Sequence, residues 1–149
     1  GIAGARTEGS KLGLLFIDLD GFKPINDRLG HDVGDELLRR VAARLTVVVG
    51  QAGAVGRYGG DEFTVVVNAG VEQADDHVAV TARRISEAPS MPYEIEGRTV
   101  QLGSSIGISQ WPDHGESAGL LLRAADQAMY EAKESGGGIR LAPAPEAAA

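Results

Sequence analysis

The chain has 149 residues, of which 23% are charged, and a formal net charge of −7 at pH 7. This length and composition are typical of one globular domain and exclude a disordered chain. The acidic balance argues against broad nucleic-acid binding, which needs a basic surface, but leaves room for a small anion held by local cations. The chain contains no cysteine, which excludes disulfides and thiolate chemistry. No apolar run approaches the roughly 20 residues of a membrane span, so we expect no membrane segment in this chain.

The first half of the chain predicts a strand, a helix and a hairpin. The continuously apolar run over 12–18 is typical of a central strand covered on both faces. The Gly- and Asp-rich stretch that follows predicts a loop over 21–27. A helical apolar spacing begins near Glu36 and ends near Gly50. Residues 54–58 and 62–67 then predict a hairpin that turns at Gly59 and Gly60.

The second half predicts another helix, a hairpin, a strand and a last helix. Apolar positions from Ala74 to Ile85 indicate a helix closed by Pro89. Residues 93–102 indicate a hairpin that turns near 96–97, and 104–109 a further strand. The last helix is expected to begin at Ser117 and to stop at the glycines 136–138, before a short strand over 139–142. This order predicts an α+β fold, with helices around a mainly antiparallel, ferredoxin-like sheet.

The chain ends suggest how the domain is bounded. We expect an N-terminal lead over 1–11, one domain over 12–142, and a disordered tail or linker over 143–149, where the sequence is rich in Ala and Pro. The absence of an initial Met suggests a piece of a longer protein.

Three carboxylates stand where the predicted strands end. Asp18 closes the first strand, and Asp61 and Glu62 follow the two glycines of the hairpin turn. If these strands pair, the carboxylates converge on one edge of the sheet, where they suit Mg²⁺ or Mn²⁺. Gly59 and Gly60 would let a phosphate approach the backbone. The alternative is an ordinary surface turn, because turns favour these residues for conformational reasons.

The stretch after the first strand adds polar groups that suit a nucleotide. Lys23 and the backbone N–H groups there suit phosphates, and Asn26 and Asp35 offer hydrogen-bonding groups that match a guanine edge. The alternatives are a solvated lysine, an asparagine in a turn and an aspartate favoured at a helix start. His31 is more often structural than catalytic in such a setting, and the histidines do not form a zinc pattern.

Four segments, in this order, closely resemble the GGDEF family of diguanylate cyclases. They are "FIDLDGFKPINDRLGHDVGDELL", "RYGGDEF", "SSIGIS" and "ADQAMYEAK", and they span most of the chain. The resemblance implies a nucleotidyl-cyclase-like fold and the condensation of two GTP molecules to cyclic di-GMP with release of two pyrophosphates. It also implies Mg²⁺ (or Mn²⁺) and a homodimer in which each domain carries one GTP.

The resemblance also assigns roles to residues at matching positions. Asp18, Asp61 and the Leu19 carbonyl would be metal ligands, Glu62 would assist at the second metal, and Asp61 or Glu62 would be the base for the 3′-hydroxyl. Substrate roles fall to further residues: Lys23 would stabilise the transition state, Lys133 would hold the triphosphate, and Asn26 and Asp35, with His31, would recognise guanine. The aspartate at position 35 favours plain GTP use.

Three departures from the family pattern matter. Gly137 stands where the family usually carries a phosphate-binding arginine, and Arg140 lies close by in sequence but in a strand that can direct it elsewhere. The inhibitory product site, an Arg-x-x-Asp motif, is replaced by "GQAG" at 50–53, so we expect no feedback inhibition through it. The family's opening helical segment is absent from the short polar lead.

Two functions from different classes follow. The leading hypothesis is a diguanylate cyclase domain. The alternative is a catalytically weak GTP-binding module that regulates an attached domain such as a cyclic di-GMP phosphodiesterase. Either hypothesis predicts a flanking sensor or phosphodiesterase domain in the parent protein and a cytoplasmic location, where GTP is found.

Overall fold

The computed structural model describes residues 11–69 and 74–144. The terminal stretches 1–10 and 145–149, which contain most of the expected lead and tail, lie outside the described residues. The elements are β1 (Lys11–Asp20), α2 (Phe22–Leu29), α3 (His31–Val49), a 3₁₀ turn η1 (Gly50–Ala52), β2 (Gly53–Arg57), β3 (Glu62–Ala69), α4 (Ala74–Ser90), β4 (Tyr93–Ile95), β5 (Arg98–Val100), β6 (Gly103–Trp111), α5 (Ala118–Glu134) and β7 (Gly138–Leu141).

A five-stranded sheet in the described part of the chain has the order β2-β3-β1-β6-β7. β1 lies at its centre and is antiparallel to both β3 and β6, while β7 is parallel to β6. The predicted α+β fold with a mainly antiparallel central sheet is therefore confirmed, and so is the terminal strand. The continuous apolar run of β1 has its reason in this position, because a central strand with helices on both faces is buried on both sides.

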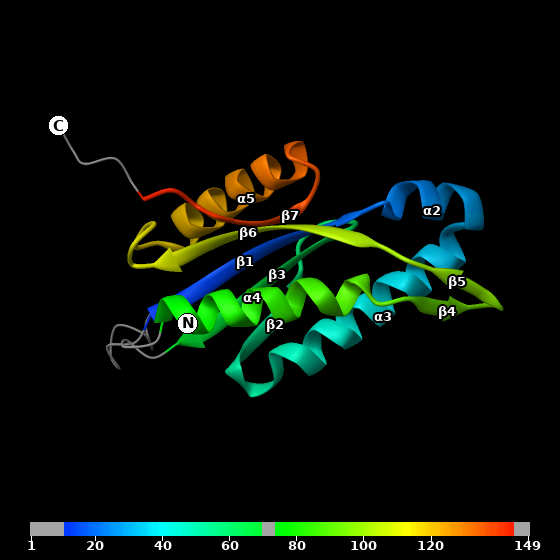
Figure 1. Ribbon diagram of the computed structural model, residues 1–149, viewed down its shortest axis with the longest axis horizontal. Coiled ribbons are helices and arrows are strands. Elements are labelled where there is room, and N and C mark those ends of the chain that lie inside the picture. Colours follow the sequence, from blue (N-terminus) through cyan, green and yellow to red (C-terminus); the bar gives the residue numbers. More distant parts are fainter. Residues whose placement is uncertain (1–10, 70–73, 145–149) are drawn as a thin grey trace.

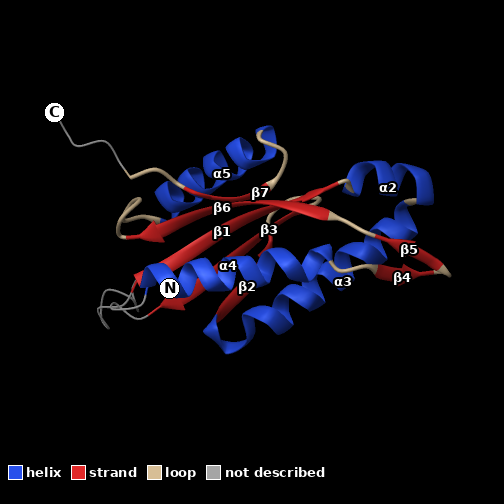
Figure 2. Cartoon of the chain, in the orientation of Figure 1, coloured by secondary structure: helices blue, strands red, loops and turns tan. Residues whose placement is uncertain are grey.

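Helices cover both faces of the sheet (Figure 1). Leu15 and Ile17 of β1 belong to the large core that also contains residues of α3 and α4. Phe16, between them, points the other way and packs with Ala125 and Met129 of α5. This alternation follows from the two-residue period of a strand. Figure 2 shows the resulting layers, with α5 on one side of the strands and α3 and α4 on the other.

The stretch predicted as a loop over 21–27 is a helix, α2, and this prediction was wrong. Gly21 adopts a left-handed φ of 84° that starts the helix, and Pro24 falls in its first turn, where a missing N–H costs nothing. Phe22 and Ile25 are buried against the core. The short apolar pair therefore supplies a packed helical face, which outweighs the loop-like composition.

The other predicted elements are found close to their expected places. α3 begins at His31, before the predicted start near Glu36, because Val33 is already buried. α4 ends directly after Pro89. The Ser117 hydroxyl caps α5 by accepting a hydrogen bond from the N–H of Leu120, and the chain leaves α5 through the predicted glycines.

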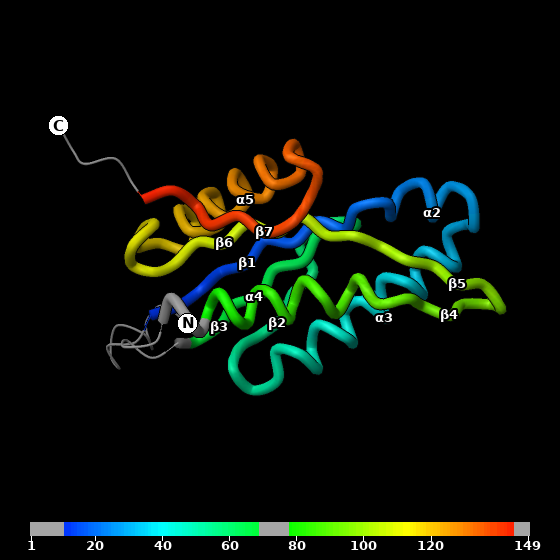
Figure 3. Tube along the Cα trace, viewed as in Figure 1, coloured from blue at the N-terminus to red at the C-terminus, as the bar shows by residue number. Residues whose placement is uncertain are grey.

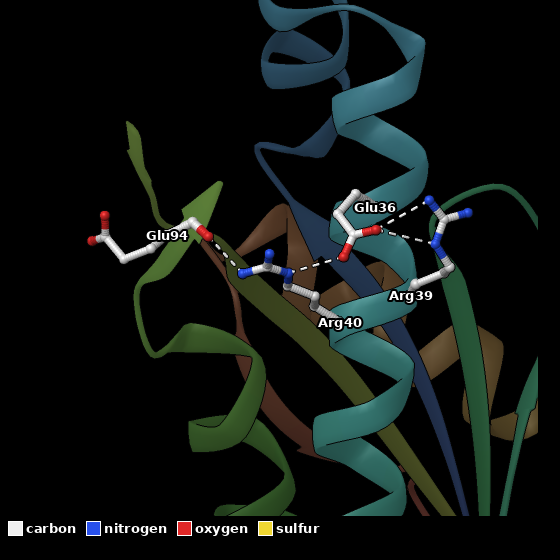
Figure 4. A network of polar contacts seen from close by, with 4 residues as sticks. All are labelled: Glu36, Arg39, Arg40 and Glu94. Atoms are coloured by element: carbon white, nitrogen blue, oxygen red, sulfur yellow. Dashed lines mark hydrogen bonds and ion pairs between the residues drawn. The ribbon is translucent and has the colours of Figure 1, made fainter. Parts of the chain in front are cut away.

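The β4–β5 hairpin forms a separate two-stranded sheet at the α2 end of the molecule (Figure 3). Two arginines of α3 hold the chain that leads into it. Arg40 donates to the backbone carbonyl of Glu94 and to the Glu36 carboxylate, which also accepts from Arg39 (Figure 4). Arg44 donates to the carbonyls of Ala88, Met91 and Pro92, and its guanidinium lies 3.7 Å from the centre of the Tyr93 ring.

No helix among the described residues is long and apolar enough to cross a membrane.

Candidate functional site

The predicted metal-binding carboxylates lie at one end of the sheet, where β1 ends and β3 begins. Asp18 stands opposite Glu62 in the antiparallel register, so both side chains lie on the α5 face. The carbonyl oxygen of Asp61 accepts a hydrogen bond from the N–H of Leu19 at 3.1 Å, which fixes the hairpin turn against the end of β1. The structure thus brings together Asp18, Leu19, Asp61 and Glu62.

Lys133, from the last turn of α5, reaches the same place. Its Nζ lies 2.7 Å from Oδ2 of Asp18. Oδ1 of Asp18 is buried and has no hydrogen-bond partner among the described residues. The hydrogen bond to Asp18 raises the pKa of Lys133, so the lysine is held in its charged form.

The acids of this site are crowded, which changes their titration. Burial raises the pKa of Asp61, and the nearby Asp18 raises it further. Burial likewise raises the pKa of Glu62, with further contributions from Asp18 and Asp61. Several like charges held together in this way are stabilised by a bound cation.

The hairpin turn is fastened by its own backbone and by one side chain that the sequence reasoning did not single out. Arg57 donates from Nε to the carbonyl of Gly59 at 3.1 Å and from Nη2 to that of Gly60 at 2.8 Å. The carbonyl of Glu62 accepts from the N–H of Tyr58 at 2.8 Å. A Cβ at Gly59 would lie 2.4 Å from a carboxylate oxygen of Glu62, so that flexible side chain would have to move, whereas Gly60 faces open space. The position of Arg57 two residues before the first glycine was the available signal for its role.

A pocket of about 310 Å³ opens beside this turn. It gathers the predicted substrate-binding residues from α2 and α3, together with part of the turn. The described residues that line it are Phe22, Lys23, Asn26, His31, Asp35, Leu38, Arg57, Gly60 and Asp61. The predicted guanine-recognising residues and a predicted metal ligand therefore share one cavity.

Asn26 is held in this pocket from two sides. Its Nδ2 lies 3.3 Å from Nδ1 of His31. Its Oδ1 lies against Gly34 of α3, where an added Cβ would come within 1.9 Å of that oxygen. The orientation of Asn26 thus depends on a histidine and on a glycine, and the sequence reasoning had assigned no role to Gly34.

The α5–β7 turn shows what replaces the missing arginine. Gly137 has a φ of +101°, and an added Cβ would lie 3.1 Å from Oδ2 of Asp20. Arg140 hydrogen-bonds to the Glu131 carboxylate and to the Ser135 hydroxyl, at 3.4 Å each. It makes no such contact with Asp18, Asp61 or Glu62. The described residues thus offer Lys133, but not Arg140, at this end of the sheet.

The oxygen donors suit a hard divalent cation that is completed by a ligand. Within 11–69 and 74–144, no three His, Cys, Asp or Glu side chains are gathered closely enough to hold a metal by themselves. Mg²⁺ typically uses one or two carboxylates together with phosphate oxygens and water. The buried, unpartnered Oδ1 of Asp18 beside two further acids fits that pattern.

Comparisons with known proteins agree on one family. Residues 2–138 match the family model described as diguanylate cyclase, GGDEF domain. The chain is 38% identical over 136 residues to the diguanylate cyclase TpbB of Pseudomonas aeruginosa, covering 91% of this chain and 31% of TpbB. It is 38% identical over 132 residues to the cyclic di-GMP phosphodiesterase NbdA of the same organism, covering 88% of this chain and 16% of NbdA.

The fold is also shared with solved structures. The crystal structure of the GGDEF domain of TpbB, also called YfiN, superposes with a TM-score of 0.87 at 38% identity, covering 97% of this chain and 89% of that one. This likeness shows the nucleotidyl-cyclase-like fold. The chain spans less than a third of the length of each of the two curated relatives named above.

Proposed function

Because the chain belongs to the GGDEF family of diguanylate cyclase domains, we propose that it condenses two GTP molecules to cyclic di-GMP and releases two pyrophosphates. The observation that carries this proposal is the shared cavity, in which Asn26 and Asp35 lie in the same pocket as Asp61. When Asn26 and Asp35 hold the guanine of a GTP molecule, its triphosphate extends toward Asp61 and the neighbouring carboxylates, where the reaction takes place.

Each group then has a defined task. The Asp35 carboxylate accepts from the guanine ring N–H and amino group, and the Asn26 amide supplies a further contact oriented by His31. Lys23 offsets charge on the transferring phosphate, and Lys133 holds the triphosphate. Mg²⁺ or Mn²⁺, held by Asp18, Asp61, Glu62 and the Leu19 carbonyl, would supply charge neutralisation at the phosphates and a lowered pKa for the attacking hydroxyl.

Asp61 or Glu62 is the base that accepts the 3′-hydroxyl proton. Both have a raised pKa, which makes their carboxylates better proton acceptors than ordinary ones near neutral pH. Neither domain holds both reacting nucleotides, so two domains must face each other in a homodimer. GTP supply places the reaction in the cytoplasm.

A second candidate function is favoured by the α5–β7 turn. With Gly137 at the arginine position and Arg140 engaged elsewhere, the triphosphate loses one charge-assisted contact. One relative, NbdA, is a cyclic di-GMP phosphodiesterase that contains a matching segment. In this alternative the domain binds GTP, turns it over weakly and regulates an attached phosphodiesterase domain.

One experiment separates the two. The chain is incubated at high concentration with GTP and Mg²⁺, cyclic di-GMP is followed by chromatography, and GTP binding is titrated in parallel. Product that vanishes in Asp61→Ala, but persists in the exposed control Asp27→Ala, supports the cyclase. GTP binding without product supports the regulatory module. The absence of both GTP binding and product would contradict both hypotheses.

A further inference from the structure

A second, larger pocket lies on the opposite face of the sheet from Asp18. It has a volume of about 630 Å³ and is bounded by α4, β6, β7 and the turn after β6. None of the described residues that line it also lines the 310 Å³ pocket beside the glycine turn, where we propose that GTP binds. Its volume falls within the range of about 300–1,000 Å³ that is usual for small-molecule sites.

The pocket is lined mostly by apolar residues, and two of these come from the edge strand β7. Ile139 and Leu141 of β7 are 41% and 54% exposed. They face this pocket together with Val78, Ala82 and Ile108. The pocket therefore offers an apolar surface that the described chain does not cover.

Gln110 of β6 is the feature that points to a ligand. The residue is only 5% exposed, yet its side-chain amide makes no hydrogen bond with any described residue. Its backbone is fully engaged, since its N–H donates to Nδ1 of His114 and its carbonyl accepts from the N–H of His114, both at 2.8 Å. The amide atoms are not among the buried polar atoms that lack a partner, so they reach the solvent of the pocket, where a bound molecule can replace water as their partner.

The charged groups at the pocket favour an anion. Arg83 of α4 lines it, and its guanidinium makes no hydrogen bond or ion pair with a described residue. The carboxylate of Asp113 is already paired with Lys11 at 3.2 Å. Nδ1 of His114 accepts from Gln110, so the neutral ring carries its proton on Nε2 and is a further donor.

We propose that this pocket binds a small carboxylic acid with an apolar body and an amide group, such as an N-acyl amino acid. The acyl chain packs on Ile139, Leu141 and Ile108, and the carboxylate pairs with Arg83. The amide group exchanges hydrogen bonds with the Gln110 carboxamide, because each offers one acceptor and at least one donor. This inference does not depend on the proposed cyclase activity.

The test is an NMR titration of the 149-residue chain with N-octanoylglycine. We expect saturable shifts of the Ile108, Ile139 and Leu141 methyl groups and of the Gln110 side-chain amide, undiminished by GTP. The methyl ester of the same compound, which lacks the carboxylate, is expected to bind about tenfold or more weakly. Octanoate, which lacks the amide, is also expected to bind more weakly.

Variants locate the interaction. Arg83→Gln should weaken binding of N-octanoylglycine by about tenfold, whereas the neighbouring Arg84→Gln, which removes the same charge outside the pocket, should not. Gln110→Met should weaken binding, because it removes the hydrogen-bonding partner of the ligand amide. Ala79→Trp, at an exposed lining position, should fill the pocket and abolish binding.

Three outcomes would overturn the proposal: no saturable shift at millimolar ligand, equal losses for Arg83→Gln and Arg84→Gln, or Gln110→Met binding as tightly as the parent chain.

Discussion

Lys133 Nζ lies 2.7 Å from Asp18 Oδ2, and this ion pair joins the last turn of α5 to the end of β1. The Asp18 side chain is only 12% exposed, whereas that of Lys133 is 48% exposed, so the carboxylate is the buried partner. The contact places a cation beside a carboxylate for which we propose a role in metal binding. It also makes α5 part of the proposed active site and not only a cover for the sheet.

We expect Lys133→Gln to lower the free energy of unfolding by about 1–2 kcal/mol, because a buried carboxylate loses its charged partner while half of the lysine faces solvent. The raised pKa of Lys133 means that this contribution is present below the ordinary lysine value of 10.5 and is lost as the pH rises through the raised value. Urea denaturation at pH 7 and 9 should therefore give the same difference. Lys11→Gln, which breaks a pair whose carboxylate partner, Asp113, is far more exposed than Asp18, is the control and should cost less than about 1 kcal/mol. Equal effects of the two variants would contradict the prediction.

Glu62→Gln should stabilise the fold and remove activity. The raised pKa of Glu62 means that its ionisation is unfavourable in the folded state above that raised value, and this cost disappears as the pH falls through it toward the ordinary 4.5. At pH 7 we expect a gain of less than about 1 kcal/mol, limited by solvent screening, and no gain at pH 4. Cyclase activity should fall by about a hundredfold or more if Glu62 is the base. Thermal melts at both pH values check this, with Glu87→Gln on the exposed face of α4 as the control.

Two glycine-to-alanine changes in helices should have opposite consequences. Gly119→Ala in α5 meets open space and should stabilise the fold by about 0.5–1 kcal/mol without affecting GTP binding. Gly34→Ala in α3 places a Cβ 1.9 Å from Oδ1 of Asn26, so that side chain must move. GTP affinity should then fall by about tenfold or more. Calorimetric titration of GTP into both variants checks this, and unchanged affinity in Gly34→Ala would remove Asn26 from the guanine site.

Placing the family arginine at position 137 should destabilise the fold. Gly137 has a φ of +101°, which other residues rarely adopt, and its Cβ position crowds Asp20. Gly137→Arg should therefore lower the free energy of unfolding by about 1 kcal/mol or more. Gly136→Arg, which has a similar φ but open space, should cost less. A tenfold gain in GTP affinity for Gly137→Arg at unchanged stability would show that the missing arginine alone limits binding.

Cyclic di-GMP should not inhibit the chain through the family's product site. Residues 50–53 supply neither the arginine nor the aspartate that the family motif needs, and they form the short turn η1 and the start of β2. Initial rates measured against increasing cyclic di-GMP should therefore show only weak competition with GTP. Potent non-competitive inhibition would sink this expectation.

Several features of this protein could be predicted from local sequence alone. The strand at 12–18, the glycine turn before Asp61 and the caps of α5 follow from hydrophobic period, turn chemistry and capping, which act between neighbouring residues. The acids at the strand ends and the polar residues at 23, 26 and 35 were also visible locally, and the resemblance to a known family added Leu19, Lys133 and the individual roles. The prediction of a loop over 21–27 was wrong because the loop-like composition does not reveal that Phe22 and Ile25 are buried.

Short-range patterns determine element types because they depend on steps of two, three or four residues, and these can be seen in the sequence. Only the tertiary structure decided that Lys133 pairs with Asp18 and that Arg57 donates hydrogen bonds to the glycine carbonyls. It also decided that Gly34 leaves space for the Asn26 side chain. It alone also decided that Arg140 turns toward Glu131 and that Gln110 lines the pocket beside α4. These are contacts whose distances depend on how helices pack on the sheet. Packing is set by the whole core at once, and no local period of the sequence contains it.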